Sequence, residues 1–368
     1  MLFWPARRPK RHGPVRRVLV VRRCCLGDVL MTTPLLAALD AAYPDATIAY
    51  AVAGWSRAAL AGNPRVGAIL PLPERTGWRN WVRVVGRWRR GRFDLAVLPE
   101  RSPVVHLAAW AAGIPRRVGL DSHGRGFALT DPVPVRGVRH EAERALDLAR
   151  GLGLPVAGTR LEYRPDAAAV ARVDALLAER GAEAPLWVVH PGGGANPGAT
   201  LDAKRWPAKR FGRVAAALVA RHGGTAILVG GPGECALTAA ARAAMGAAGA
   251  NALDLAGRLD FAALGALCAR AALYVGNDSG PTHLAEACGA PVVAVFGPTD
   301  PAMYGPVDGV GEAVWDAAAC APYVVRGDLT RVGAGGNTRC IDAISVEDVL
   351  AAAERVLARA AARTRVAR

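Results

Sequence analysis

The chain has 368 residues, of which 46 are lysine or arginine and 31 are acidic, giving a formal net charge of +15. An apolar content of 52% excludes a disordered chain, and the length is typical of a protein with two domains. No uncharged stretch reaches the roughly 18 residues that a membrane-spanning helix needs, which excludes an integral membrane protein of the helical type.

Short β-branched runs alternate with Ala-rich stretches along the whole chain. In the first half this pattern predicts strands over 17–22, 47–52, 66–70 and 94–98 and helices over 28–42, 140–151 and 166–180. In the second half it predicts strands over 186–190, 225–229, 272–276 and 292–296 and helices over 207–222, 234–245, 261–270, 281–288 and 346–361. Such alternation is typical of parallel sheets covered by helices on both faces. The sequence therefore predicts an α/β fold with two Rossmann-like doubly wound domains, 1–182 and 183–345, and a cleft between them.

The end of the first predicted strand carries the sequence RRCCLGDVLMTTP, from Arg22 to Pro34. Gly27 permits a sharp turn there, and Asp28 falls at the start of the following helix. Aspartate is a favoured helix N-cap, so Asp28 has a purely structural interpretation. Alternatively, its carboxylate faces the cleft and takes a proton from a substrate hydroxyl.

The strand over 186–190 ends in HPGGG, which leads to Lys204-Arg205-Trp206-Pro207. Glycines such as Gly192 and Gly193 expose backbone N–H groups, and Lys204 supplies a positive charge for a phosphate. The alternative is an ordinary loop with a solvated basic patch. Neither GxxxxGK[ST] nor a complete GxGxxG is present, which argues against a P-loop NTPase and a standard dinucleotide site.

Two further strands of the second half end in glycine-containing turns. Gly231 precedes Glu234, which could cap a helix or bond a ribose. The run GNDSGPTH, residues 276–283, combines Asp278 with the amides of Ser279 and Gly280 and a Pro in the first helical turn, where an anion would bind. His283 alone is more typical of a helix residue than of a catalyst. Together these turns predict a nucleoside diphosphate bound mainly to the second domain.

Most of the excess positive charge lies in residues 1–180, which hold 29 basic and 15 acidic residues. Residues 1–23 and 75–92 contain no acid, and in the second stretch tryptophans recur at helical spacing between arginines. A membrane interface or an anionic acceptor would use Arg79, Arg83, Arg87, Arg90, Trp81 and Trp88. The alternative is a surface helix whose tryptophans face the core. No motif supports nucleic-acid binding.

The order and content of these motifs resemble glycosyltransferase family 9, the ADP-heptose:lipopolysaccharide heptosyltransferases. The likeness covers most of the chain, and its strongest parts are VLVVRRCCLGDVLMTTPLLAALDAAYPDA, VVHPGGG with KRWPAKRF, ILVGGPGE, and LYVGNDSGPTHLAEACGAPVVAVFGPTDP. The resemblance implies a GT-B fold with a terminal helix, within 346–368, that packs back on the first domain. It also implies inverting transfer with no metal and no cofactor, the nucleotide sugar being a substrate.

The same resemblance assigns roles to individual residues. Asp28 matches the general base of the family, Lys204 its phosphate-binding lysine and Glu234 its ribose-contacting acid. Asp278, with the amides of Ser279 and Gly280, matches the loop that holds the donor diphosphate and sugar. Gly192, Gly193, Gly231 and His283 complete the expected donor site, while Cys320 and Cys340 are too sparse for a metal site.

The expected function is transfer of a sugar, heptose from an ADP-activated donor, to a lipopolysaccharide-type acceptor. The alternatives are transfer of another sugar to a different envelope glycan, and a non-catalytic protein that binds a nucleotide sugar or a glycolipid. Residues 1–17 contain no long apolar core, and Cys24 and Cys25 are adjacent among seven cysteines, which suits a reducing compartment. We therefore expect a cytoplasmic protein, peripheral on the inner membrane face.

Overall fold

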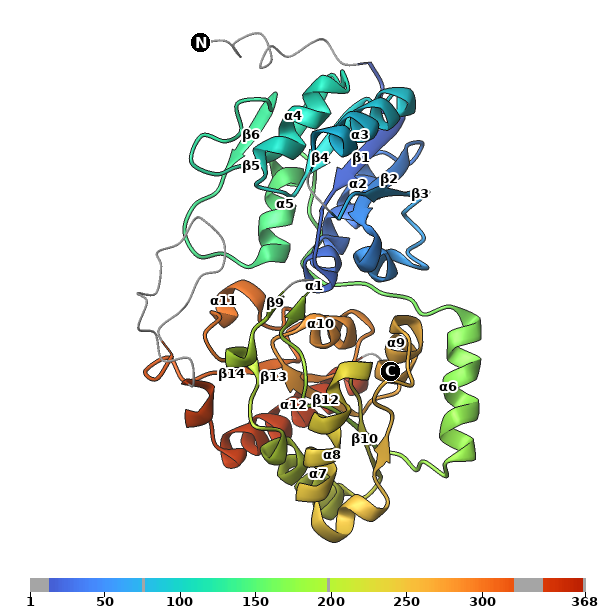
Figure 1. Cartoon of the computed structure of the whole chain (residues 1–368), viewed down its shortest axis with the longest axis vertical. Coiled ribbons are helices and arrows are strands. Elements are labelled where there is room, and N and C mark those ends of the chain that lie inside the picture. Colours follow the sequence, from blue (N-terminus) through green and yellow to red (C-terminus); the bar gives the residue numbers. More distant parts are fainter. Residues whose placement is uncertain (1–12, 75–76, 197–198, 321–339, 367–368) are drawn as a thin grey trace. The chain divides into compact units, whose positions relative to one another are not determined.

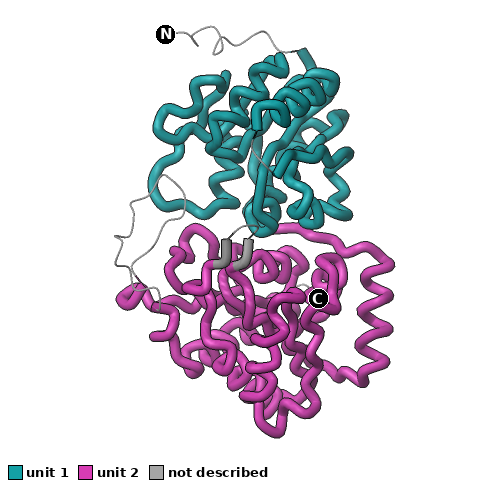
Figure 2. Tube along the Cα trace, viewed as in Figure 1, with its two compact units in different colours: residues 1–160 teal, residues 161–368 magenta. Residues whose placement is uncertain are grey.

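The computed structural model describes residues 13–74, 77–196, 199–320 and 340–366. The chain forms two compact units, Met1–Arg160 and Leu161–Arg368 (Figure 2). Each unit contains a six-stranded sheet whose strands all pair in parallel. The predicted pair of Rossmann-like domains is therefore confirmed.

The sheet of the first unit has the order β3-β2-β1-β4-β5-β6 (Figure 1). Its strands are β1 (Arg17–Val21), β2 (Thr47–Ala53), β3 (Ala68–Leu72), β4 (Leu95–Leu98), β5 (Arg116–Asp121) and β6 (Asp131–Pro134). Its helices are α1 (Leu26–Leu30), α2 (Thr33–Ala42), the 3-10 segment η2 (Gly54–Leu60), α3 (Trp78–Gly91), α4 (Pro103–Ala111) and α5 (Glu141–Gly151). The order reverses between β1 and β4, which is where ligands bind in open sheets of this kind.

The sheet of the second unit has the same order in its own numbering, β11-β10-β7-β12-β13-β14. Its strands are β7 (Leu186–His190), β10 (Thr225–Leu228), β11 (Leu253–Asp254), β12 (Leu273–Asn277), β13 (Val292–Val295) and β14 (Glu312–Val314), with a separate pair β8 (Ala195–Asn196) and β9 (Ala199–Thr200). The order reverses between β7 and β12, so a ligand is expected at the carboxyl ends of these two strands.

Helices cover both faces of this second sheet (Figure 1). They are α6 (Ala167–Glu179), α7 (Ala208–His222), α8 (Cys235–Ala244), α9 (Phe261–Cys268), α10 (Gly280–Ala287), α11 (Pro301–Tyr304) and α12 (Val346–Val366), with 3-10 segments η3 (Asp202–Lys204), η4 (Pro232–Glu234), η5 (Gly246–Ala250) and η6 (Cys340–Ala343). Alternate residues of β7 face opposite layers: Trp187 packs with α7, α8 and α12, whereas Val188 packs with α6 and α9. This alternation explains why the strands are apolar throughout.

Two predictions about segment boundaries are wrong in detail. The helix expected over 28–42 is divided into α1 and α2, because Pro34 lacks an N–H group and its ring crowds the carbonyl four residues earlier. The units divide after Arg160 and not after residue 182, because α6 packs on α9 and shares its core. The sequence analysis also did not identify β5, β6, β11 and β14.

The terminal helix α12 belongs to the second unit, whereas the sequence analysis placed it against the first. It packs on α7, β13 and β14, and Val349, Ala353 and Val356 are buried in the core there. Arg355 and Arg359 pair with Glu312 of β14 and fix the helix along the sheet edge. Among the helices of the described residues, none has the length and apolarity to cross a membrane.

Seven cysteines include one disulfide, between Cys320 and Cys340. The sequence pattern did not predict this pairing. Cys24, Cys25, Cys235, Cys268 and Cys288 do not form disulfides. The covalent bond ties the chain near β14 to the 3-10 segment that precedes α12.

Glu286 is a buried carboxyl group in the last turn of α10. Its Oε1 accepts hydrogen bonds from the backbone amides of Val307 and Asp308 at 2.5 and 3.1 Å, which holds the loop before β14. Burial raises the pKa of Glu286 to about 7, although the Val307 amide acts in the opposite direction. The folded chain therefore holds this proton more tightly than the unfolded chain does.

This pKa predicts a loss of stability between about pH 4.5 and pH 7. A raised carboxyl pKa stabilises the fold fully below the unfolded value of 4.5, and this contribution is lost as the pH rises through 7. We expect Glu286→Gln, which keeps the accepting oxygen, to remove a pH-dependent loss of at most about 3 kcal/mol in urea unfolding. Glu179→Gln, at an exposed position, is the control, and equal pH profiles for wild type and Glu286→Gln would contradict the assignment.

Candidate functional site

Asn277 connects the ends of the two central strands of the second unit. It is fully buried at the end of β12, and its Nδ2 donates to the carbonyl oxygens of Pro191 and Gly192, at 3.3 and 2.8 Å. Its Oδ1 accepts from the backbone amide of Trp206 at 2.9 Å. The segments after β7 and before α7 are thereby held at the point where the strand order reverses, which the sequence analysis did not foresee.

Glu234 holds the glycine turns after β7 and β10 together. Its Oε1 accepts from the Gly193 amide at 2.6 Å, and its Oε2 accepts from the Gly231 amide at 2.7 Å and lies 3.1 Å from His190 Nε2. Burial raises the pKa of Glu234, but His190 and the two amides outweigh it and lower the pKa to about 2. The carboxylate is therefore ionised, and three of its roughly four acceptor positions are used within the protein.

The turn at Gly192 and Gly193 requires glycine for two different reasons. A Cβ at Gly192 would collide with the carboxylate of Glu234. Gly193 has a φ of +103°, and a Cβ there would lie 2.7 Å from the Cβ of Ser279. The absence of side chains thus brings this backbone against Glu234 and against the start of α10.

Lys204 and Asp278 form an ion pair that joins η3 to the end of β12. Lys204 Nζ lies 2.5 Å from Asp278 Oδ2, which also accepts from Thr299 Oγ1 at 2.6 Å, and His283 Nε2 lies 3.6 Å from Asp278 Oδ1. Burial opposes ionisation of Asp278, yet Lys204 and His283 hold its pKa well below its usual range. The lysine charge is thus held beside the first turn of α10.

Ser279 is the N-cap residue of α10, and Gly280 is the first residue of that helix. Amides at a helix N-terminus carry partial positive charge and favour an anion. Gly193 contacts Ser279, so the turn after β7 also reaches this end of α10. The structure therefore brings together all the expected donor residues: Gly192, Gly193, Lys204, Gly231, Glu234, Asp278, Ser279, Gly280 and His283.

Sequence reasoning missed several residues that build this site. His190 and Thr299 fix the carboxylates of Glu234 and Asp278, respectively. Arg205 Nε donates to the carbonyl oxygen of Gly193 at 2.8 Å and supports the glycine turn. The only signal in the sequence was their position in or beside the glycine motifs, because each acts through a contact distant in sequence.

In the first unit Asp28 lies at the carboxyl end of β1, next to the reversal of strand order. Its Oδ2 is 3.0 Å from Nη2 of Arg22, whose Nη1 donates to the carbonyl oxygen of Pro99 after β4. The same Nη2 lies 3.6 Å from Glu141 Oε2 of α5, and Arg101 lies 2.7 Å from Oε1 of that residue. A buried charge network thus holds Asp28 in place.

Asp28 is not the N-cap of α1, so the capping interpretation is wrong. The N-cap is Cys25, and Asp28 lies within the first turn of the helix. Since Arg22 exposes only 3% of its side chain, the carboxylate neutralises a buried guanidinium. This arrangement places a carboxylate, paired with Arg22, at the end of a central strand.

The basic helix α3 separates its aromatic residues into two groups. Trp88 is 1% exposed, and Trp81 packs against the same core. Both side chains therefore face the core, as in the alternative interpretation, and the expectation that they contact a membrane is wrong. Trp78 and Val82 are instead 73% and 62% exposed. Arg79, Arg83, Arg87 and Arg90 are also exposed, with Arg79 over the ring of Trp78. Arg75, at the start of the acid-free stretch, lies outside the described residues.

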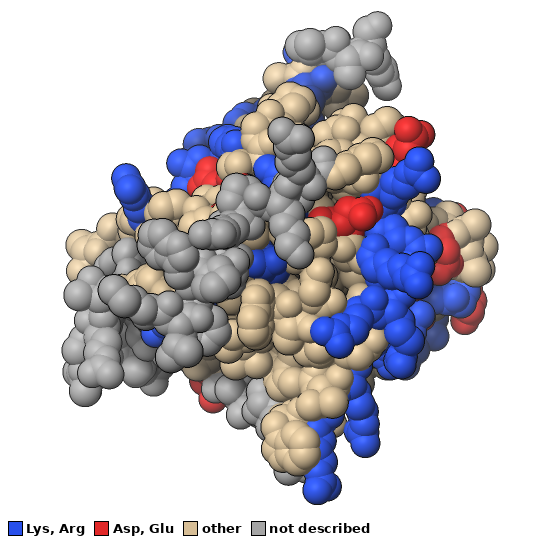
Figure 3. Space-filling view, turned by 90° about the horizontal axis from the view of Figure 1, so that it is seen from above, with Lys and Arg blue, Asp and Glu red and all other residues tan. Residues whose placement is uncertain are grey.

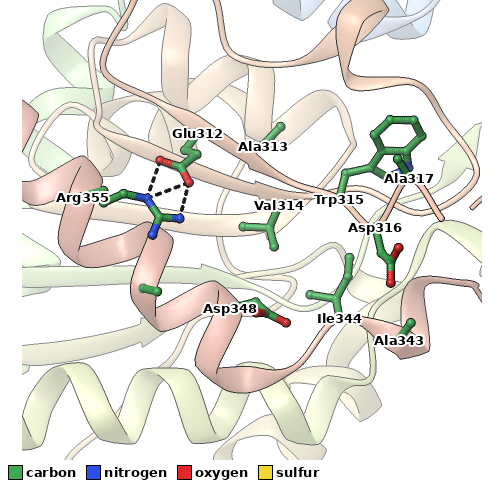
Figure 4. Close-up of a pocket in the computed structure, with 11 residues that line it drawn as sticks. Glu312, Ala313, Val314, Trp315, Asp316, Ala317, Ala343, Ile344, Asp348 and Arg355 are labelled. Atoms are coloured by element: carbon green, nitrogen blue, oxygen red, sulfur yellow. Dashed lines mark hydrogen bonds and ion pairs between the residues drawn. The ribbon is translucent and has the colours of Figure 1, made fainter. Parts of the chain in front are cut away.

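A separate pocket of the second unit lies between β14 and α12 (Figure 4). Glu312, Trp315, Asp348 and Arg355 are among the residues that line it, and Figure 4 shows Arg355 turned toward Glu312. None of the residues expected to bind donor contributes to its lining. This pocket is therefore separate from the expected donor site.

The chain is similar in sequence to known glycosyltransferases. The family model for glycosyltransferase family 9 (heptosyltransferase) matches residues 81–331. Lipopolysaccharide heptosyltransferase 3 of Escherichia coli K12 is 29% identical over 345 residues, which cover 90% of this chain and 95% of that protein. Lipopolysaccharide heptosyltransferase 2 of the same strain is 29% identical over 304 residues, covering 77% of this chain and 84% of that protein.

Solved structures of similar proteins share the fold. A family 9 glycosyltransferase from Veillonella parvula has a TM-score of 0.77 at 22% identity, covering 95% of this chain and 100% of that chain. The E. coli ADP-heptose lipopolysaccharide heptosyltransferase II has a TM-score of 0.72 at 23% identity, covering 93% and 99%. The family resemblance and the predicted GT-B fold are both confirmed, and the chain belongs to glycosyltransferase family 9, the heptosyltransferase family, and is a glycosyltransferase.

Proposed function

We propose that this enzyme transfers heptose from ADP-heptose to a lipopolysaccharide core acceptor, with inversion at the anomeric carbon and without a metal ion. The proposal rests first on the Lys204–Asp278 pair beside the N-terminus of α10, an arrangement suited to a diphosphate. It is supported by the relatives, which are named lipopolysaccharide heptosyltransferases and align over 77–90% of this chain.

The donor would bind at the carboxyl ends of β7, β10 and β12. Lys204 and the amides at Ser279 and Gly280 would bind the diphosphate, because a cation and a helix N-terminus both stabilise negative charge. Glu234 would accept a ribose hydroxyl at its remaining acceptor position. Asp278 would bond a sugar hydroxyl, since it is already neutralised by Lys204 and does not repel the phosphates as a lone carboxylate would.

Asp28 would act as the general base. Its carboxylate removes the proton of the acceptor hydroxyl while that oxygen attacks the anomeric carbon, and the bond to the diphosphate breaks on the opposite face. A single displacement of this kind inverts the configuration. Arg22 would hold the Asp28 carboxylate in position, and Glu141 would in turn hold the guanidinium of Arg22 through the contacts already described.

The departing diphosphate gains negative charge as the bond breaks. Lys204 and the first turn of α10 lie where they could stabilise that charge without a divalent cation. This is the physical basis for proposing transfer that needs no metal. The acceptor would bind to the basic first unit, with its phosphate or carboxylate groups near exposed arginines.

The donor assignment predicts which nucleotide sugar stabilises the protein. We expect ADP-heptose to raise the thermal unfolding midpoint more than UDP-, GDP- or dTDP-sugars do. Lys204→Gln removes one charge-assisted contact to phosphate, worth about 1.5–3 kcal/mol, so it should weaken ADP-heptose binding roughly tenfold or more. Lys209→Gln, at another of the three lysines, is the control. An equal response to all four nucleotides would contradict the donor assignment.

The base assignment predicts the effect of Asp28→Asn. The amide keeps the shape of the carboxylate but accepts no proton, so kcat should fall by about 10²–10⁴, while donor affinity stays within about twofold. Transfer by the wild type should persist in EDTA. Asp40→Asn, at an exposed carboxylate of α2, serves as the control for a generic loss of charge. Turnover of Asp28→Asn at the wild-type rate would exclude the role.

Peripheral attachment to an anionic membrane is the second part of the proposal. Arg79, Arg83, Arg87 and Arg90 form one exposed stripe of α3, and the exposed Trp78 and Val82 lie beside it. Figure 3 shows a face of the molecule on which basic side chains gather with few acidic ones among them. Arginines near a charged surface contribute about 1 kcal/mol each, and tryptophan favours the interface.

This surface predicts salt-sensitive binding to vesicles. Replacing Arg79, Arg83 and Arg90 with Gln should lower sedimentation with phosphatidylglycerol vesicles by at least tenfold, and Trp78→Ser should lower it less. A triple variant of Arg172, Arg180 and Arg221, exposed arginines of the second unit, is the matched control. Equal sedimentation of both triple variants would show that the arginines of α3 are merely solvated.

A further inference from the structure

Two thiols and a carboxylate meet at the end of β1. Cys24, Cys25 and Asp28 each offer a ligand atom, and all three atoms lie within 4.8 Å of one another. The two sulfur atoms are 3.2 Å apart, and all three residues are half-buried. The transfer reaction proposed above uses only the carboxylate, so it gives no role to the thiols.

The local backbone explains why these atoms converge. Cys24 and Cys25 follow β1 directly, and Cys25 caps α1, accepting the amide of Val29 at its carbonyl oxygen. Asp28 lies three residues further on, and a side chain in the first turn of a helix points back toward the preceding turn. A segment of five residues therefore presents all three groups to one point.

This set of atoms suits a soft divalent cation. Thiolates select ions such as Zn²⁺, and catalytic zinc sites often have three protein ligands and one open position. With Zn–S bonds of about 2.3 Å and tetrahedral angles, two sulfurs bound to one ion lie about 3.8 Å apart. The sulfurs of Cys24 and Cys25 would need to separate by roughly half an ångström, which rotation about their side-chain bonds permits.

The local charges also favour such an ion. Two thiolates and the Asp28 carboxylate carry three negative charges, and Zn²⁺ with the Arg22 guanidinium carries three positive charges. Glu141, which also contacts Arg22, is paired with Arg101 and adds no net charge. Since Arg22 contacts Oδ2 of Asp28, the ion would bind the carboxylate through Oδ1. The neutral sum reduces the cost of placing an ion beside a buried guanidinium.

We propose that Cys24, Cys25 and Asp28 form a binding site for Zn²⁺ whose occupation inhibits transfer. Binding releases the two thiol protons to solvent and forms two Zn–S bonds and one Zn–O bond. The carboxylate lone pair is then bound to the ion and cannot accept a proton from the acceptor hydroxyl. The inhibitory step rests on the proposed role of Asp28 as base, whereas the binding step does not.

Cobalt titration tests the binding step directly on the reduced full-length protein. Co²⁺ replaces Zn²⁺, and each thiolate bound to it contributes to a charge-transfer absorption band. We expect one equivalent of Co²⁺ to produce the band in the wild type and in Cys235→Ser, which removes an exposed thiol elsewhere. Cys24→Ser with Cys25→Ser should abolish it, each single variant should halve its intensity, and Asp28→Asn should weaken Co²⁺ binding at least tenfold.

Absence of the band in the wild type, or its persistence in the double serine variant, would overturn the site. The single variants give the same answer if the double variant does not fold. A Cys320→Ser/Cys340→Ser variant should retain the band, because the disulfide lies in the second unit. Loss of the band in that variant alone would place the cobalt there and overturn the proposal.

Inhibition is measured separately, with each variant compared with its own rate in EDTA. Zn²⁺ should inhibit wild type and Cys235→Ser at the concentration at which it displaces Co²⁺, and the double serine variant should need at least tenfold more. If cobalt binds as described while Asp28→Asn keeps full turnover, the general-base assignment fails and the metal site stands. If Asp28→Asn is inactive and no cobalt binds, the metal site alone fails.

Discussion

A buried amide at the end of β12 is the contact on which the second unit depends. Where strand order reverses, neighbouring strands lead to opposite sides of the sheet and leave a gap that ligands use. Asn277 spans this gap with hydrogen bonds to Pro191, Gly192 and Trp206, while its own carbonyl oxygen accepts from Thr282. A buried polar side chain with every hydrogen-bonding group satisfied fixes backbone geometry strongly, because any displacement leaves unpaired groups.

In the first unit, a charged side chain connects the ends of the two strands at which the strand order reverses. Arg22 follows β1 and reaches the carbonyl oxygen of Pro99 after β4, the other strand at its reversal point. Burying a guanidinium requires compensating carboxylates, and Asp28 and Glu141 provide them. The predicted base is thus part of the network that holds the strand ends. A conservative change at Arg22 would alter both stability and the position of the carboxylate.

Two carboxylates of the second unit, Glu234 and Asp278, hold its glycine turns and the end of β12 in place. Glu234 uses most of its acceptor positions to hold two glycine turns, and Asp278 is held by Lys204, Thr299 and His283. The low pKa values of both residues follow from these contacts. Groups fixed in this way need little reorganisation when a charged ligand binds, which is how preorganised sites gain their electrostatic advantage.

The sequence by itself determined the two α/β domains and the family, and it singled out the residues that the structure brings together at the carboxyl ends of β7, β10 and β12. Wholly apolar strands that alternate with helical stretches are typical of parallel sheets covered by helices on both faces. Glycine turns at the strand ends mark where backbone segments approach closely. Tertiary structure decided what depends on contacts between distant segments. Examples are the burial of Trp88, the position of α12, the disulfide between Cys320 and Cys340, and the bridging role of Asn277. The sequence of an amphipathic helix shows that one face is apolar but does not show which element that face packs against. The contacts of a single asparagine side chain likewise depend on which distant segments the fold brings near it.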